Sequence, residues 1–177
     1  MSPVCVLVGP PGAGKTTVGQ LLATALRVAF RDTDADIEAM AGKTVPDIFV
    51  EDGEEAFRTL ESAAIATALR EFDGVLALGA GAVLAPANRQ RLRDQRVVFL
   101  STGFADAIGR VRLSAGRPLL AINPRATLKR LLEQRLPLYE EVATITVKTD
   151  GRTPEEVAAE VGAALRATRD LGEKHPQ

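Results

Sequence analysis

The sequence has one cysteine, one histidine and no tryptophan among its 177 residues. The lone Cys5 cannot form an internal disulfide, and its place in an apolar run predicts a small buried hydrophobic side chain. The lone His175 lies in a polar tail, 172–177, which we expect to be frayed. Histidine acid–base chemistry and histidine metal ligation are therefore not expected. Because no disulfide can form within the chain, the composition favours a cytoplasmic protein.

The sequence also lacks a surplus of charge of either sign and any long apolar run. Its 22 Lys and Arg residues nearly balance 23 Asp and Glu residues, so we expect no nucleic-acid partner and no anionic membrane surface. No apolar run approaches the roughly 20 residues of a membrane helix, and no signal peptide is predicted. With 46% hydrophobic residues and a length of 177, the chain is expected to form one domain over 1–177.

Glycine is concentrated near the N-terminus, where residues 9–16 are G-P-P-G-A-G-K-T. This matches the phosphate-binding P-loop pattern G-x-x-x-x-G-K-[ST]. A β-branched apolar run at 4–8 predicts the strand that must precede the loop, and apolar spacing over 18–26 predicts the helix that must follow. Lys15 would then reach the β- and γ-phosphates of a nucleotide, and the Thr16 hydroxyl would hold Mg²⁺. The alternative, a strand–helix turn that binds no ligand, is disfavoured by this context.

Short apolar runs alternate with helical patterns along the whole chain. We expect strands at 4–8, 28–32, 75–78, 97–100 and 145–148. We expect helices at 18–26, 36–40, 45–49, 54–70, 88–93, 104–113, 127–136 and from 153 onward. The helix at 127–136 is expected to end before Pro137. The alternation predicts an α/β fold, a three-layer α/β/α arrangement around a five-stranded parallel sheet.

Ligands of such sheets bind beyond the carboxyl ends of the strands, and two of these ends have suggestive residues. The second strand ends in Asp32 and Asp34, which on an extended segment would point the same way and could hold Mg²⁺ directly or through water. The third strand ends in G-A-G at 79–81, where small residues allow a ligand to approach the backbone closely. A solvated acidic turn and an ordinary glycine turn remain the respective alternatives.

Three arginines are candidates for binding an anionic substrate. Arg58 has carboxylates at helical spacing, Glu54 and Glu61, although the pattern also fits a surface ion pair. Arg117 lies in a Gly/Pro-rich segment that could act as a lid, or it is a solvated loop charge. Arg135 lies at the end of a predicted helix, where a cation is favourable in any case.

Taken in order, these motifs resemble the shikimate kinases, small P-loop kinases of the nucleoside-monophosphate-kinase-like group. The resemblance covers about 4–165 and rests on the following motifs: G-P-P-G-A-G-K-T-T from Gly9, D-T-D from Asp32, D-I-F from Asp47, E-x-x-F-R-x-x-E from Glu54, L-G-x-G-A-V from Leu78, R-P-L-L from Arg117 and R-x-P-L-Y from Arg135. One position departs from the family, because Ala80 replaces the middle one of three glycines. A positive φ there would make alanine cost roughly 1 kcal/mol, and otherwise its methyl group could intrude on the substrate pocket.

The resemblance implies transfer of the γ-phosphoryl group of ATP to the 3-hydroxyl of shikimate, a step in aromatic amino-acid synthesis, by a monomer that uses Mg²⁺. The implied catalytic residues are Lys15, Asp34 and Arg117. The implied ATP-binding residues are Gly12, Ala13, Gly14, Lys15, Thr16, Thr17, Arg110, Arg117 and Pro154. The implied shikimate-binding residues are Asp34, Phe49, Phe57, Arg58, Gly79, Ala80, Gly81 and Arg135. The implied metal-binding residues are Thr16, directly, and Asp32, through water.

The resemblance further implies that Glu61 orients Arg58, that a helical region at about 33–61 binds the acceptor, and that about 112–124 forms a lid. Two alternatives stay open at this point. One is a sibling kinase that acts on another carboxylated polyol, such as gluconate, or on a nucleotide. The other is a nucleotide-binding module without turnover, which the presence of Lys15, Asp34 and Arg117 disfavours.

Overall fold

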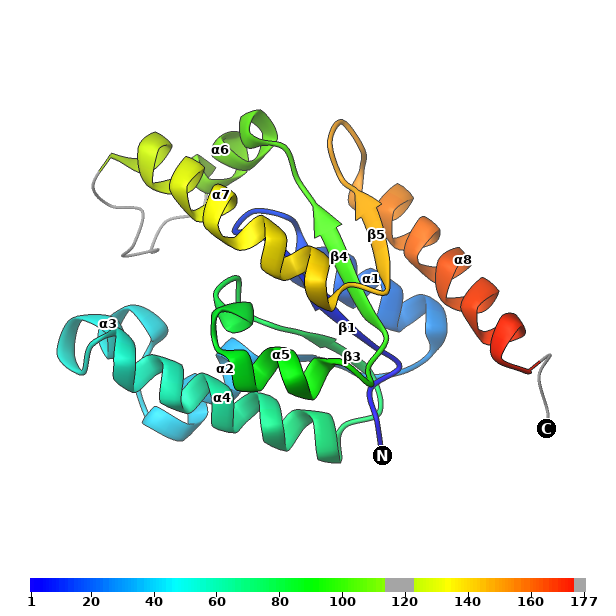
Figure 1. Ribbon diagram of the computed structural model, residues 1–177, viewed down its shortest axis with the longest axis horizontal. Coiled ribbons are helices and arrows are strands. Elements are labelled where there is room, and N and C mark those ends of the chain that lie inside the picture. Colours follow the sequence, from blue (N-terminus) through cyan, green and yellow to red (C-terminus); the bar gives the residue numbers. More distant parts are fainter. Residues whose placement is uncertain (114–122, 174–177) are drawn as a thin grey trace.

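Strands and helices alternate along the chain, as predicted (Figure 1). The computed structural model describes residues 1–113 and 123–173, so Arg117 and His175 lie outside the described residues. The strands are β1 (Cys5–Val8), β2 (Phe30–Asp32), β3 (Val75–Ala77), β4 (Val97–Ser101) and β5 (Ile145–Lys148). The helices are α1 (Lys15–Leu26), α2 (Thr33–Ala41), α3 (Val45–Glu51), α4 (Glu54–Glu71), α5 (Pro86–Leu92), α6 (Phe104–Leu113), α7 (Pro124–Val142) and α8 (Pro154–Glu173), with a short 3₁₀ helix, η1 (Ala82–Leu84).

The five strands form one parallel sheet in the order β2-β3-β1-β4-β5, which confirms the predicted fold class. Leu7 of β1 is in register with Ala77 of β3 on one side and with Val98 of β4 on the other. The chain leaves β1 toward β2, but it leaves β4 toward β5, in the opposite direction. The strand order therefore reverses at β1, and a ligand crevice is expected beyond the carboxyl ends of β1 and its neighbours.

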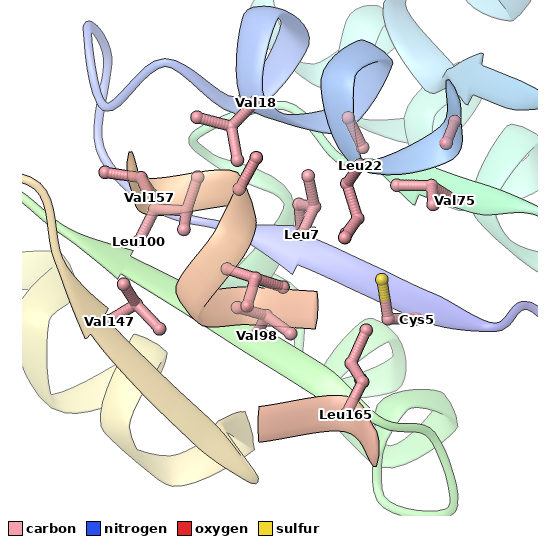
Figure 2. Packing of buried hydrophobic residues seen from close by; sticks show 14 of the residues in the cluster. Cys5, Leu7, Val18, Leu22, Val75, Val98, Leu100, Val147, Val157 and Leu165 are labelled. Atoms are coloured by element: carbon pink, nitrogen blue, oxygen red, sulfur yellow. The ribbon is translucent and has the colours of Figure 1, made fainter. Parts of the chain in front are cut away.

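Helices cover both faces of this sheet, α1 and α8 on one and α4, α5 and α7 on the other (Figure 1). Alternate residues of β1 serve the two faces, since side chains along a strand point to opposite sides. Leu7 lies in one buried cluster with Leu22 of α1 and Leu165 of α8, and Figure 2 shows Leu7 beside Leu22 and Leu165 beside Cys5. Val6 packs instead with Ile65 of α4. Cys5 is fully buried in the first of these layers, as expected, and burial raises the pKa of its thiol to about 12.

Helices α2, α3 and α4 enclose a smaller apolar cluster beside the sheet. Its buried members are Ile37, Ile48, Phe57 and Ala64. This cluster fixes the N-terminal half of α4 against α2, which begins directly at the end of β2. The first turns of both helices are thereby held near the carboxyl edge of the sheet.

The prediction that a helix ends before Pro137 is wrong. Helix α7 continues to Val142 with Pro137 inside it. An internal proline removes a helical hydrogen bond and costs about 3 kcal/mol. That local cost is offset by burial of residues after it, because Tyr139 and Val142 both pack into the core layer with β4.

The second strand and the helix after it also differ from the prediction. We expected Asp32 and Asp34 on one extended segment, but α2 begins at Thr33 rather than at residue 36. Asp32 caps this helix, since its Oδ1 accepts a hydrogen bond from the Asp34 amide at 2.9 Å. Asp34 therefore lies in the first helical turn, and the cap rather than the strand pleat sets its direction.

The start of α8 is predicted correctly by its capping box. The Glu156 amide donates to Thr153 Oγ1, and the Thr153 amide donates to Glu156 Oε2. Helix α8 extends to Glu173, so the first two residues of the expected tail are helical.

Within 1–113 and 123–173, none of the helices has the length and apolar character that crossing a membrane requires.

Packing of α1 on the sheet predicts opposite effects for one substitution at two glycines. A methyl group on Gly19 of α1 would overlap the Phe30 ring, whereas one on Gly109 of α6 meets no atom within 4 Å. We expect Gly19→Ala to lower the free energy of unfolding by about 1–3 kcal/mol through overpacking. Gly109→Ala should raise it by up to about 1 kcal/mol through helix propensity. Urea denaturation followed by circular dichroism measures both, and equal shifts would contradict the packing explanation.

Candidate active site

The glycine-rich loop between β1 and α1 is folded as a P-loop requires. Gly12 and Gly14 have φ values of 78° and 88°, which favour glycine, and Gly14 caps α1. The ammonium group of Lys15 donates to the carbonyl oxygens of Gly9 at 2.8 Å and Pro10 at 3.0 Å. Lys15 thus lies across the loop, where the amides at the start of α1 also favour an anion.

Next to this loop, Thr16 and Asp32 place two hard oxygen atoms side by side. The Thr16 hydroxyl donates to Asp32 Oδ2 at 3.1 Å. Hydroxyl and carboxylate oxygens are ligands that Mg²⁺ accepts, so these residues fit such an ion. Among the described residues, no group of three or more His, Cys, Asp and Glu side chains could hold a metal. An ion at Thr16 would therefore depend on phosphate oxygens and water for most of its ligands.

The loop after β3 has glycine at positions 79 and 81 because charged side chains occupy the space where a Cβ would lie. A Cβ built on Gly79 would lie 2.9 Å from Glu61 Oε1 and 3.1 Å from Asp34 Oδ1. A Cβ on Gly81 would overlap the Arg58 guanidinium. These two glycines are needed for close approach and not for a left-handed backbone, since neither has a positive φ.

Ala80, between these glycines, does not have the positive φ that we considered. The only non-glycine residues with positive φ in the described part of the chain are Arg27 and Asn123. Alanine therefore carries no backbone strain at position 80. Ala80 does line the cleft described below, so its methyl group contributes to the shape of that cleft.

Arg58 and Glu61 form an ion pair that is mostly buried. Arg58 Nη1 donates to Glu61 Oε2 at 2.7 Å, and Nη2 donates to Glu54 Oε1 at 3.3 Å. Glu61 is only 1% exposed, so the alternative of a surface ion pair is wrong for this partner. Burial raises the pKa of Glu61, and the charge of Arg58 opposes that rise. The guanidinium also lies 5.3 Å from the centre of the Phe57 ring.

Arg135 lies inside α7 and not at a helix end, because the helix continues past it. It is only 4% exposed, and burial lowers the pKa of its guanidinium. One turn later, the Tyr139 hydroxyl donates to the Ala80 carbonyl oxygen at 2.6 Å. Tyr139 is the last residue of the R-x-P-L-Y motif, but we predicted no role for it.

Arg110 reaches from α6 to the P-loop. Its Nη1 donates to the Gly12 carbonyl oxygen at 3.1 Å and to Thr149 Oγ1 at 3.2 Å, and its Nη2 donates to the Thr149 carbonyl oxygen at 3.2 Å. It thereby connects the P-loop to the end of β5. The sequence pattern contains no signal for these contacts, which join residues 39 and 98 positions apart.

A single cleft of about 1070 Å³ brings most of the candidate residues together. The candidates that line it are Gly12, Gly14, Lys15, Thr16, Thr17, Asp32, Asp34, Phe49, Phe57, Arg58, Gly79, Ala80, Gly81, Arg110 and Arg135. Glu61, Arg31 and Leu131 line it as well. Ala13, within the P-loop, is buried, and Pro154 is exposed at the start of α8; neither belongs to this lining. Arg117 lies outside the described residues.

Comparison with known proteins decides the family. The family model described as shikimate kinase matches residues 11–166. The chain belongs to the shikimate kinase family. A shikimate kinase of Salinispora arenicola (strain CNS-205) is 62% identical over 167 residues, which cover 94% of this chain and all of the relative. The prediction of an ATP-dependent kinase of this family is confirmed.

Solved structures agree with this membership. A shikimate kinase from Acinetobacter baumannii, solved in complex with shikimate, matches with a TM-score of 0.90 and 38% identity over 95% of this chain and 94% of that one. A gluconokinase from Sinorhizobium meliloti 1021 matches with a TM-score of 0.65 and 23% identity, over 97% of each chain. The match to the gluconokinase shows a shared fold only. Membership of the shikimate kinase family rests on the sequence matches as well as on the fold.

Burial of Glu61 predicts a pH dependence of stability. Because the pKa of this carboxyl is raised in the folded protein from its usual value of 4.5, the folded state binds the proton more tightly than the unfolded state. The stability that Glu61 contributes is therefore present below pH 4.5 and is lost as the pH rises through the raised pKa. The measurement is urea denaturation of the wild type and of Glu61→Gln at several pH values. We expect the difference in free energy of unfolding, wild type minus variant, to fall as the pH rises through this window.

Glu54→Gln is the matched control, because it removes the other carboxylate partner of Arg58. Glu54 is 53% exposed, so this change should alter stability by less than about 1 kcal/mol at any pH. A difference between wild type and Glu61→Gln that rises with pH would contradict the assigned direction.

Proposed function

We propose that this protein transfers the γ-phosphoryl group of ATP to the 3-hydroxyl of shikimate, giving shikimate 3-phosphate and ADP. One observation carries the proposal: the same cleft is lined by the P-loop, by two arginines, Arg58 and Arg135, and by Asp34. A phosphoryl donor and a carboxylated acceptor can thus be bound together. Phosphoryl transfer needs mainly such positioning and charge stabilisation.

At the acceptor end, Arg58 and Arg135 would bind the shikimate carboxylate, since guanidinium groups match carboxylates in geometry and charge. Glu61 would hold Arg58 in place through their ion pair. Among the described residues, the Nε atoms of both arginines and the Oε1 of Glu61 are buried and have no hydrogen-bond partner. A polar ligand in the cleft would satisfy such groups, whereas leaving them unsatisfied is costly.

The rest of the acceptor site would surround the ring of the substrate. Phe49 and Phe57, with ring centres 4.6 Å apart, would form an apolar wall. The backbone of 79–81 would support the ring hydroxyls, because no side chain projects from Gly79 or Gly81. Phe49 and Phe57 belong to the helical region at about 33–61 to which we assign acceptor binding.

At the donor end, the amides of residues 12–17 would surround the phosphates of ATP. Lys15 would exchange the carbonyl oxygens of Gly9 and Pro10 for the β- and γ-phosphates. Arg110 and Pro154 would flank the adenine, with Arg110 kept near the loop by its Gly12 contact.

Thr16 would hold Mg²⁺ directly, and Asp32 would hold it through water. When bound, the ion neutralises phosphate charge and orients the γ-phosphoryl group. The separation of 3.1 Å between the Thr16 hydroxyl and Asp32 Oδ2 supports this pairing.

We also propose that the protein works as a cytoplasmic monomer.

Asp34 would accept the proton, or the hydrogen bond, of the attacking hydroxyl. It lies in the first turn of α2 because Asp32 caps that helix through the Asp34 amide. The proposed contact of Arg117 with the transferring phosphoryl group, from a lid at about 112–124, involves residues outside those that the structure describes.

Release of ADP with Mg²⁺ and ATP tests the proposed function. We expect release that depends on shikimate and is negligible both without acceptor and with gluconate. The gluconate arm is informative because the fold is shared with a gluconokinase. Equal or faster turnover with gluconate would overturn the assigned acceptor, and ATP binding without any acceptor-dependent turnover would favour a non-catalytic module.

The close approach at Gly81 predicts a selective loss of acceptor binding. We expect Gly81→Ala to displace the Arg58 guanidinium and raise the KM for shikimate at least tenfold, equivalent to about 1.4 kcal/mol. The KM for ATP should change little, since the hydrogen-bond partners of Arg58 are Glu54 and Glu61 on α4 and not residues of the P-loop. Ala80→Gly is the matched control in the same loop and should leave both constants within about twofold, because position 80 is unstrained.

A further inference from the structure

Tyr139 makes the side-chain contact that joins α7 to the loop after β3. It is the only tyrosine of the chain, and it is 1% exposed. Its hydroxyl donates to the Ala80 carbonyl oxygen at 2.6 Å, which is short for a bond between neutral groups. Its ring stacks on Phe99 of β4, with centres 5.1 Å apart and planes inclined by 23°.

This bond completes the hydrogen bonding of the carbonyl groups in the loop. The Gly79 carbonyl accepts from the Ala82 amide and the Gly81 carbonyl accepts from the Leu84 amide, both within the turn that forms η1. The carbonyl between them, that of Ala80, accepts instead from a residue 59 positions away. The loop is therefore held locally at two points and attached to α7 at the third.

The same face of α7 also has Arg135. Residues four apart on a helix are neighbours on its surface, so the Arg135 and Tyr139 side chains lie one turn apart. Each also affects the other electrostatically. Burial raises the pKa of Tyr139 to about 12, and the positive charge of Arg135 acts against that rise. The hydroxyl consequently remains a donor at all physiological pH values.

We propose that Tyr139 is a positioning residue for the acceptor, whose hydroxyl fixes the spacing between the 79–81 backbone and Arg135. The inference rests on the proposed function, in which the loop binds ring hydroxyls and Arg135 binds the carboxylate. Both groups belong to one small rigid substrate, so the distance between their binding elements must be kept closely. Loss of the bond would let the loop and α7 shift independently.

Packing alone does not account for the hydroxyl. A phenylalanine would fill nearly the same volume and stack equally well on Phe99, without the cost of burying a polar group. The hydroxyl therefore matters through the groups that it contacts, which are the Ala80 carbonyl and the Arg135 side chain.

Tyr139→Phe separates this role from core packing. Removing the donor leaves a buried carbonyl unsatisfied, so we expect the KM for shikimate to rise about tenfold. The KM for ATP should stay within about twofold. Leu92→Val is the matched control: Leu92 belongs to the same buried cluster and, like Tyr139, lies outside the cleft lining, but its side chain has no hydrogen-bond donor, so the change should lower the melting temperature and leave both KM values unchanged.

A shikimate KM within about twofold of wild type in Tyr139→Phe would overturn the proposal. An equal rise of both KM values, or the same rise in Leu92→Val, would also overturn it, because either result indicates general loosening of the core.

Two further measurements do not depend on turnover. Amide hydrogen exchange over 79–84 should be faster in Tyr139→Phe than in wild type and Leu92→Val, and unchanged exchange would show that the hydroxyl does not hold the loop. Since the chain has no tryptophan, its tyrosine fluorescence reports on Tyr139 alone, and saturating shikimate should alter it. If the wild type shows no shikimate-dependent ADP release, the proposed function fails, while hydrogen exchange still decides whether the bond fixes the loop.

Discussion

At the carboxyl end of β3, positions 79 and 81 have no room for a side chain, and the rest of the site depends on that constraint. Arg58, Glu61 and Asp34 all reach the same short loop, and a Cβ at Gly79 or Gly81 would collide with them. Charges brought this close in a partly buried site interact strongly, since little water screens them. The loop can therefore present backbone to a ligand while arginine and carboxylate groups surround it. Alanine is accommodated at position 80 because its backbone is unstrained and its carbonyl, rather than its side chain, makes the structural contact.

Burying charged groups in such a site lowers the stability of the folded protein, and the apolar packing on the sheet offsets this loss. Burial raises the pKa of Glu61 despite its bond to Arg58, which means that the fold disfavours the ionised pair that the site uses. Buried ion pairs often contribute less to stability than apolar residues of the same volume would. The apolar layers on both faces of the sheet supply the stability instead. Because α4 and α7 pack on the sheet through Ile65 and Tyr139, the charged side chains of these helices are held in fixed places beside the strand ends.

The features that the sequence predicts well are those with a local physical cause. Residues 9–16 need a particular backbone to surround phosphate, and that need appears as glycines in a fixed pattern. Five apolar runs become five strands, and the apolar stripe of α4 becomes a buried face. The features it predicts poorly depend on distant residues. Arg110 was placed at the nucleotide from family resemblance alone, and its contacts with Gly12 and Thr149 become visible only when α6, the P-loop and β5 meet.

Helix α7 shows why one such prediction is wrong. By local rules, Pro137 indicates a helix end. Helix α7 nevertheless continues, because it packs against two different parts of the structure. Its first half packs on α6 through Leu128, and its last turns enter the main core through Tyr139. A break at Pro137 would separate these halves, whereas continuity keeps Arg135 and Tyr139 on one face. Burial after the proline outweighs the lost helical bond, so the helix that contacts α6 at one end extends to the 79–81 loop at the other. The geometry of the acceptor site thus depends on a helix that local sequence rules would have ended six residues too early, at 136 instead of Val142.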